Sequence, residues 1–155
     1  MQRVHRNGVD LEYDVQGAGE LLVLIHGSIL ADAFFPLLAD PCIASHYRVI
    51  LYHRRGFAGS SRARTPFTIA EQAADGRALL RHLGVARAHL AGHSYGAAMA
   101  LQWACDAPTD VQSLALLDPP SLRPFPRGQR SVTGSPPSGS SCMTLGTKQG
   151  PLTRS

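Results

Sequence analysis

The stretch Gly92-His93-Ser94-Tyr95-Gly96 carries the side chain best suited to covalent chemistry in this sequence. A serine between two such glycines fits a sharp strand-to-helix turn that lifts its hydroxyl clear of the sheet. Glycine has no Cβ, so the chain on either side can pass close to the turn. The pattern predicts a nucleophilic serine at position 94. It also fits a glycine-rich turn whose serine only caps a helix, and the pattern alone does not separate the two.

A serine hydroxyl needs an adjacent base to become a good nucleophile. The chain has seven histidines, and none of them follows Ser94. Three upstream histidines could stand in as the base, and we interpret all three as structural: His26, His53 and His93. For His93, the strained turn is expected to send the two adjacent side chains apart.

The elements around Ser94 suggest how it is positioned. The apolar run 85–91 is typical of a buried strand, and the small residues after Gly96 suit a helix. Similar apolar runs predict strands at 21–25, 47–52 and 113–117, and an alternating run predicts a half-exposed strand at 9–15. Helices are expected at 31–39, interrupted by Pro36, and from Thr68, whose capping box with Glu71 opens a helix to about His82.

Strands alternating with helices predict an α/β fold, with a mostly parallel sheet covered by helices on both faces. In such sheets, ligands bind beyond the carboxyl ends of the strands. The segments following the predicted strands are His26-Gly27-Ser28, the loop 53–60, Ser94 and Asp118. We therefore expect these segments to share one edge of the sheet.

Three of these segments, His26–Ser28, Arg55–Ser60 and Gly92–Gly96, make residues 1 to about 120 resemble the N-terminal portion of the α/β-hydrolase fold family, in its serine esterase or lipase-like branch. The resemblance implies that Ser94 is the nucleophile and that the backbone N–H groups of Ser28 and Tyr95 stabilise the oxyanion. It also implies a small-molecule acyl substrate, hydrolysed through an acyl-enzyme with no cofactor. A serine at position 94 speaks against the epoxide hydrolase and dehalogenase branches, which need a carboxylate nucleophile.

The remaining family positions are less complete in this sequence. Asp118 stands where some members place the triad acid, but we favour a strand-ending Asp ahead of Pro119-Pro120. The resemblance makes His26 a turn residue bonded to backbone, and His53 stands where the family often has Asp. Because no histidine follows Ser94, two alternatives stay open: an inactive truncated or frame-shifted fragment, or a half that needs a partner chain.

Composition changes near residue 120. Residues 1–120 hold ten arginines and eleven acidic residues, whereas residues 121–155 hold five cations and no acid. Ser, Gly and Pro make up 17 of those last 35 residues, so we expect one domain at 1–120 and a disordered basic tail at 121–155. No basic helix or stripe suggests a nucleic-acid partner.

Other interactions can be expected from the same composition. No apolar run is long enough for a membrane span and no secretory signal is recognisable, so a cytoplasmic location is expected. The scattered residues Cys42, Cys105 and Cys142 argue against a disulfide framework and a zinc site, and Cys105 is expected in the core. The apolar strand 113–117 could allow self-association through an exposed sheet edge.

Overall fold

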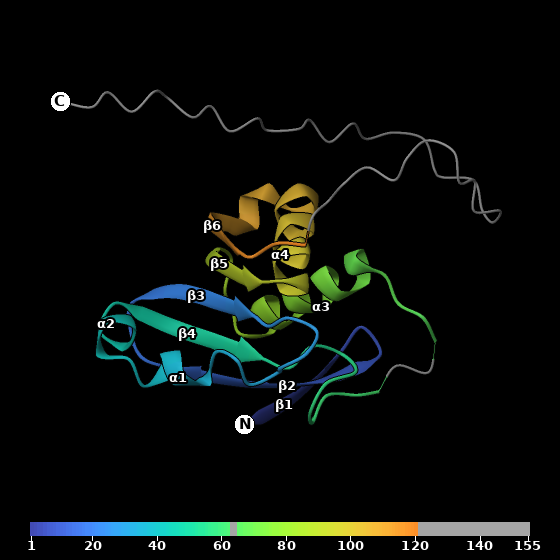
Figure 1. Ribbon diagram of the computed structural model, residues 1–155, viewed down its shortest axis with the longest axis horizontal. Helices are drawn as coiled ribbons and strands as arrows, with labels where there is room; N and C mark the ends of the chain where they lie inside the picture. Colours follow the sequence, from blue (N-terminus) through green and yellow to red (C-terminus); the bar gives the residue numbers. More distant parts are fainter. Residues whose placement is uncertain (63–64, 121–155) are drawn as a thin grey trace. The chain divides into compact units, whose positions relative to one another are not determined.

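A six-stranded sheet forms the centre of the part of the chain that the structure describes (Figure 1). The computed structural model describes residues 1–62 and 65–120. The strands are β1 (Gln2–Arg6), β2 (Val9–Gln16), β3 (Glu20–Ile25), β4 (Tyr47–Tyr52), β5 (Ala88–His93) and β6 (Val111–Leu117). Their spatial order is β1-β2-β4-β3-β5-β6. Strands β4, β3, β5 and β6 pair in parallel, whereas β2 pairs antiparallel with both β1 and β4. The predicted mostly parallel sheet is confirmed.

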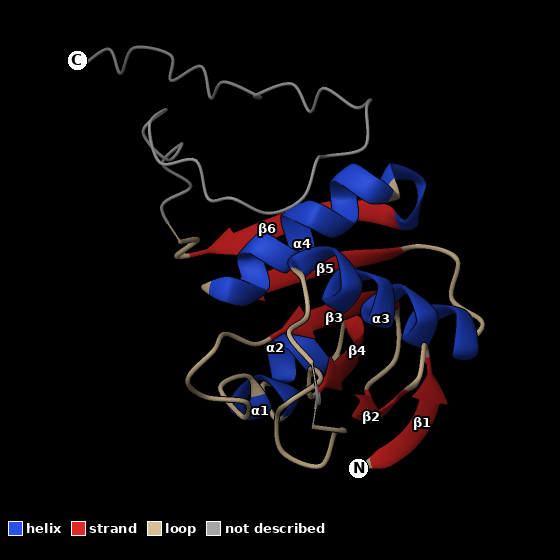
Figure 2. Cartoon of the chain, turned by 90° about the vertical axis from the view of Figure 1, so that its right-hand side faces the viewer, coloured by secondary structure: helices blue, strands red, loops and turns tan. Residues whose placement is uncertain are grey.

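Helices cover both faces of this sheet, as predicted. The helices are α1 (Phe35–Leu38), α2 (Pro41–Ala44), α3 (Ile69–His82) and α4 (Tyr95–Asp106), with a short 3-10 turn at Pro108–Asp110. The long helices α3 and α4 lie side by side (Figure 2). They close one core with Val23 and Ile25 of β3, and the α1–α2 segment closes a second core with Leu22 and Leu24. Alternate side chains of β3 therefore serve opposite cores.

Helix α3 begins where the sequence predicts. Thr68 Oγ1 accepts from the Glu71 N–H at 3.1 Å, and Glu71 Oε2 accepts from the Thr68 N–H at 2.7 Å. Each side chain satisfies a backbone donor that would otherwise lack an intrahelical partner. This reciprocal pair fixes the start of a helix that buries Leu79 and Leu80 against the sheet.

Two expectations about helices are wrong. The single helix expected at 31–39 is instead a short α1 followed by α2, because Pro36 and Pro41 each occupy a first turn, where a missing N–H is tolerated. Cys105 is exposed rather than in the core. It lies two residues beyond the buried Trp103, which is a rotation of roughly 200° around the helix.

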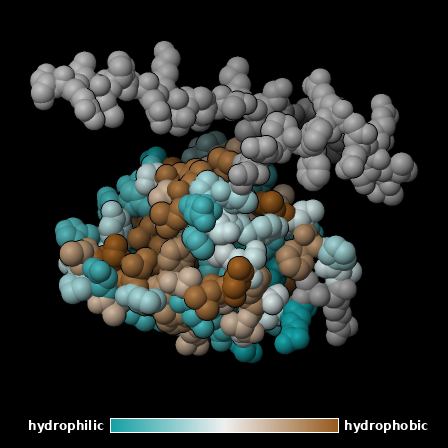
Figure 3. Space-filling view, in the orientation of Figure 1, coloured by the Kyte–Doolittle hydropathy of each residue, from teal (hydrophilic) through white to brown (hydrophobic). Residues whose placement is uncertain are grey.

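Coverage is incomplete at the β5–β6 side of the sheet. Ala88 and Leu90 of β5 are buried toward α4, but His89 and Ala91 on the opposite face are only half-buried. In β6 no residue is fully buried, and within the described residues this strand pairs only with β5. On the face shown in Figure 3, apolar residues reach the surface beside polar ones.

The predicted tail at 121–155 lies outside the described residues. Within residues 1–62 and 65–120, no helix is long and apolar enough to cross a bilayer.

Candidate active site

Ser94 occupies a strained turn between β5 and α4. Its backbone has φ 52° and ψ −120°, a conformation that non-glycine residues rarely adopt. Its N–H donates to the Leu117 carbonyl at 2.9 Å, which ties the turn to the end of β6. A Cβ at Gly92 would overlap the Gly96 carbonyl, and one at Gly96 would overlap the Ile25 carbonyl. Both glycines are therefore required for the strand and helix to pass this closely.

The loop after β3 packs directly against this turn. A Cβ added to Gly27 would lie 3.3 Å from the Cβ of Ser94. A cavity of about 140 Å³ separates the two segments, and its lining consists of Gly27, Ser28, Ile29, Leu30, Ala33, His93 and Ser94. The structure thus brings the predicted residues Ser28 and Ser94 together around one small cavity.

Tyr95 contributes to this region through its main chain. It is the first residue of α4, so its N–H belongs to the turn whose donors have no intrahelical acceptor. The positive end of the helix dipole also lies here, which favours negative charge beside Ser94. The Tyr95 hydroxyl accepts from Gln72 Nε2 at 3.3 Å. The oxyanion roles of Ser28 and Tyr95 stay predictions.

Asp118 follows β6 directly, with φ 46°. Its neighbour Leu117 accepts the Ser94 N–H, so the Asp118 backbone lies close to the turn. The residue is exposed, and within the described ranges no hydrogen bond or ion pair reaches its carboxylate. The structure therefore brings Asp118 near Ser94 without joining it to a histidine of the described part.

His26 is held entirely by main-chain groups, as the resemblance implies. Its Nε2 accepts from the Arg54 N–H at 3.0 Å, so Nδ1 carries the proton and donates to the Gly27 carbonyl at 2.7 Å. Burial, reinforced by the Arg54 charge, lowers the pKa of His26 to about 4. At neutral pH the ring is uncharged and both nitrogens are engaged, so His26 cannot act as a base for Ser94.

The other two histidines differ from each other. His53 is buried between two carboxylates, with Nδ1 2.8 Å from Glu12 Oε2 and Nε2 2.9 Å from Asp32 Oδ1. Its hydrogen bond lowers the pKa of Glu12. His93 lines the same cavity as Ser94, although we expected the turn to separate them. No hydrogen bond joins the two among the described residues.

Sequence reasoning missed Arg54, which is only 2 % exposed. Its Nη1 donates to Gln72 Oε1 at 2.6 Å and its Nη2 to the Gly27 carbonyl at 2.8 Å. The guanidinium also lies over the rings of Phe57 and Tyr95, 4.5 and 5.0 Å from their centroids. Burial lowers its pKa. Within the described residues, no carboxylate pairs with this cation.

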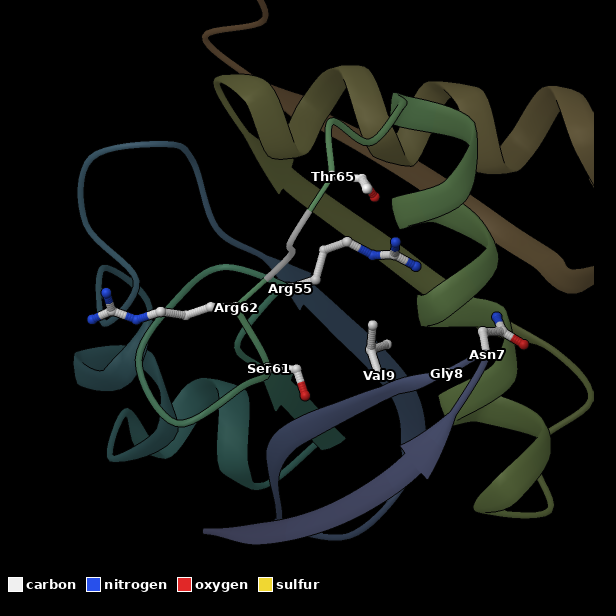
Figure 4. Close-up of a pocket in the computed structure, with 7 residues that line it drawn as sticks. All are labelled: Asn7, Gly8, Val9, Arg55, Ser61, Arg62 and Thr65. Carbon is white, nitrogen blue, oxygen red and sulfur yellow. The ribbon is translucent and has the colours of Figure 1, made fainter.

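A larger cavity of about 490 Å³ lies elsewhere, lined by Asn7, Gly8, Val9, Arg55, Ser61, Arg62 and Thr65. Figure 4 shows the Arg55 side chain directed toward α3, where it forms a bidentate pair with Asp75 at 2.6 and 2.7 Å. Arg62 extends away from the other side chains (Figure 4). The described part of the chain contains no group of three or more His, Cys, Asp or Glu residues placed to hold a metal. The smaller cavity, in contrast, is lined by Ser94, the residue that the sequence predicts as the nucleophile.

Comparison with known proteins gives relatives with several hydrolytic activities. The chain is 33% identical to a putative carbamate hydrolase RutD of Azorhizobium caulinodans over 118 residues, which cover 76% of this chain and 44% of that protein. It is 36% identical to a fluoroacetate dehalogenase of a Burkholderia species over 109 residues, covering 67% of this chain and 36% of the relative. Among solved structures, Est816, described as an N-acyl homoserine lactone degrading enzyme, matches with a TM-score of 0.71 and 30% identity, covering 76% of this chain and 45% of that chain.

The chain spans less than half the length of these relatives. A sequence profile described as the alpha/beta hydrolase fold matches residues 20–133, which include the loop after β3, the Ser94 turn and β6. The profile and the sheet around that turn agree, and the chain belongs to the α/β-hydrolase fold family.

Proposed function

We propose that Ser94 is the nucleophile for hydrolysis of an ester or a related acyl compound. The observation that carries this proposal is the strained Ser94 backbone at the start of α4, facing the Gly27–Ser28 loop across a small cavity. A residue held in such a conformation is often functional. The names of two relatives, a carbamate hydrolase and an N-acyl homoserine lactone degrading enzyme, are compatible with acyl chemistry. The dehalogenase relative is less informative, since dehalogenation needs a carboxylate nucleophile and position 94 is serine.

The proposed reaction has two steps. The Ser94 hydroxyl oxygen attacks the acyl carbon, its proton passes to a base, and the bond to the leaving alcohol or amine breaks. Water then attacks the acyl-enzyme and releases the acid. In both steps the carbonyl oxygen becomes negatively charged, and the N–H groups of Ser28 and Tyr95 would stabilise it.

The cavity suggests the kind of acyl group that could fit. Its volume is about 140 Å³, and its rim carries Ile29, which is 99% exposed, and Leu30, which is 60% exposed. Adjacent apolar side chains that line a cavity favour contact with an apolar part of a substrate. We therefore propose a small apolar acyl group as the part of the substrate that lies beside Ser94.

The base is the missing component of this proposal. No histidine follows Ser94 in the sequence, and among the described residues no histidine is hydrogen-bonded to it. This observation favours a second candidate, in which the chain by itself is inactive, either as a fragment or as a half that needs a partner chain to supply the base. Both candidates share the same Ser94 turn, and they differ in how fast the Ser94 hydroxyl reacts.

Labelling with a fluorophosphonate, followed by mass spectrometry over hours, tests both. We expect slow labelling at Ser94, because oxyanion donors are available but no base activates the hydroxyl. Ser94→Ala should abolish the label, whereas Ser28→Ala should retain it, since Ser28 acts through its backbone N–H. Fast stoichiometric labelling lost in Ser94→Ala would eliminate the inactive alternative. Labelling that persists in Ser94→Ala would refute the nucleophile, and no labelling of the wild type would favour the inactive alternative.

A further inference from the structure

The peptide group between Gly27 and Ser28 has an unusually well-defined orientation. Its carbonyl accepts two hydrogen bonds, one from His26 Nδ1 at 2.7 Å and one from Arg54 Nη2 at 2.8 Å. Both donors come from buried residues, so neither is replaced easily by water. A carbonyl oxygen has two lone pairs, and these two donors occupy its full capacity.

The orientation of this carbonyl also determines where the Ser28 N–H points. No peptide bond among the described residues is cis, and in a trans peptide the C=O and N–H groups point in opposite directions. Holding the carbonyl toward His26 and Arg54 therefore turns the Ser28 N–H away from them. That N–H has no backbone acceptor among the described residues, and Ser28 lines the cavity with Ser94.

Arg54 contributes to this arrangement in two ways. Its backbone N–H donates to His26 Nε2, which forces the proton of the neutral ring onto Nδ1, the nitrogen that donates to Gly27. Its side chain supplies the second donor to the same carbonyl. A flip of this peptide would therefore leave two buried donors without their acceptor.

The surroundings of Arg54 keep its guanidinium available for Gly27. The other hydrogen-bond partners are neutral, the Gln72 amide oxygen at 2.6 Å and the Met99 sulfur at 3.6 Å. The Arg54 guanidinium also makes cation–π contacts with the rings of Phe57 and Tyr95. Its neighbour Arg55 instead forms a bidentate pair with Asp75. A carboxylate placed in the same way beside Arg54 would compete with the Gly27 carbonyl for its donors.

We propose that Arg54 is a positioning residue that, together with His26, locks the Gly27–Ser28 peptide so that the Ser28 N–H stays directed at an oxyanion formed on Ser94. Arg54 does not itself touch the reacting atoms in this proposal. The proposal rests on the proposed function of Ser94 for its catalytic meaning, but the lock itself is a property of the folded chain that can be measured separately.

The test uses the full chain, with Arg54→Met and Arg54→Lys as variants and Arg55→Lys as the matched control. Arg54→Met removes every side-chain donor and keeps the backbone N–H that donates to His26, and Arg54→Lys keeps the charge but loses the planar fork that reaches Gln72 and Gly27 together. Arg55→Lys keeps a cation beside Asp75 and leaves the Gly27 carbonyl untouched. The structural readout is the Gly27 carbonyl ¹³C resonance, together with the scalar coupling across the hydrogen bond from Arg54 Nη2 in the wild type.

The functional readout is the dissociation constant of phenylboronic acid, which forms a tetrahedral adduct with a nucleophilic serine. We expect Arg54→Met to move the Gly27 resonance upfield and to weaken the boronate about tenfold or more, as for loss of an oxyanion donor. Arg54→Lys should fall between Arg54→Met and the wild type. Arg55→Lys should change the affinity by less than about twofold, as for a substitution remote from the adduct.

The outcomes separate the two proposals. If the Gly27 resonance is unchanged in folded Arg54 variants, or the wild-type coupling is absent, the lock is refuted. If Arg54→Met does not fold, the Arg54→Lys resonance and the wild-type coupling decide the question. If the wild type forms no boronate adduct, Ser94 is unreactive in this chain, as the inactive alternative predicts, whereas the carbonyl readout still decides whether Arg54 holds the peptide.

Discussion

The two sides of the sheet differ in how completely they are covered. On the β3–β4 side, helices close both faces, and even the polar residues His26, His53 and Arg54 are buried and hydrogen-bonded. On the β5–β6 side, the described residues cover one face with α4 and leave the other without a helix, and Leu116 and Leu117 are 37% and 46% exposed. Ser94 lies where the two sides meet, at the end of β5.

This contrast shows how the fold divides its tasks. The covered side can hold a peptide group in one orientation, because water does not compete for its buried hydrogen bonds. On the open side, no β6 residue is fully buried, so truncating one of its side chains removes less buried surface. The candidate site therefore combines the Gly27–Ser28 loop from the covered side with the Ser94 turn at the end of β5.

The largest expected effect is a difference in unfolding free energy between two leucine-to-alanine substitutions, one on each side of the sheet. Leu51 of β4 is fully buried, so Leu51→Ala should lower the free energy of unfolding by about 2–5 kcal/mol through lost burial and the cavity left behind. Leu117→Ala on β6 should change it by less than about 0.5 kcal/mol. Urea unfolding monitored by circular dichroism measures both. Equal losses would show that β6 is covered in solution.

A second contrast concerns pH. The pKa of His26 is about 4 in the folded chain, below its ordinary value of 6.5, so the unfolded chain binds the proton more tightly. The contribution of the neutral ring is complete above pH 6.5 and is lost as the pH falls toward 4. Between pH 6.5 and 5 the loss should be on the order of 2 kcal/mol.

The His26→Asn variant isolates this effect. Asparagine cannot titrate but retains a donor for the Gly27 carbonyl. The difference in unfolding free energy between wild type and variant should therefore shrink, or change sign in favour of the variant, as the pH is lowered from 7 to 5. A difference that stays constant over this range would show that His26 titrates normally in the folded chain.

The two edges of the sheet provide a third contrast. Edge strand β1 carries Arg3, His5 and Arg6, whereas β6 presents leucines, and exposed apolar edges favour pairing with another chain. We propose that the protein self-associates through β6. Leu117→Lys should weaken association by about tenfold, since a charge at the edge opposes pairing.

Sedimentation velocity over a concentration series measures this association, with Gln2→Lys on β1 as the matched control. The control should associate as the wild type does. A wild type that stays monomeric at high concentration would refute self-association, and equal effects of the two variants would refute the assignment to β6.

The smallest expected effect on stability comes from removing the hydrogen bond between His53 and Asp32, which lies in the loop after β3. The Asp32 side chain is 62% exposed, so Asp32→Ala should reduce stability by less than about 1 kcal/mol. It should nevertheless speed hydrogen exchange of amides in residues 28–33 severalfold, because His53 then holds only Glu12. Asp14→Ala, which removes a carboxylate bonded to Gln16, should leave this exchange unchanged.

Much of the fold could be predicted from the sequence because its signals are local. The capping box at Thr68, the apolar strands and the glycines around Ser94 each specify a geometry within a few residues. The missed strand β1 buries only Val4, so it lacks an apolar pattern. Its signal was present in Asn7-Gly8, whose φ values of 51° and 76° suit a two-residue hairpin turn.

The site was less predictable because its partners are distant in the chain. His53 contacts Glu12 and Asp32, which are 41 and 21 positions away. The sequence offers two adjacent arginines, and nothing local determines that Arg55 pairs with Asp75 while Arg54 is buried against Gly27. Burial of a charged residue depends on tertiary packing, and no short motif encodes it. The Ser94 turn was identifiable because its constraint lies within five residues.

The hydrogen bond from the Ser94 N–H to the Leu117 carbonyl has a thermodynamic consequence. It joins the strained turn to the last described strand, so a change at Ser94 that strengthens or weakens this bond would also change how firmly β6 is held. By reciprocity, the free energy that a Ser94 adduct contributes to holding β6 equals the free energy that docking of β6 contributes to the adduct. The exposed edge strand would thus act as an effector: a change in how β6 packs would change the affinity of a ligand that binds to Ser94.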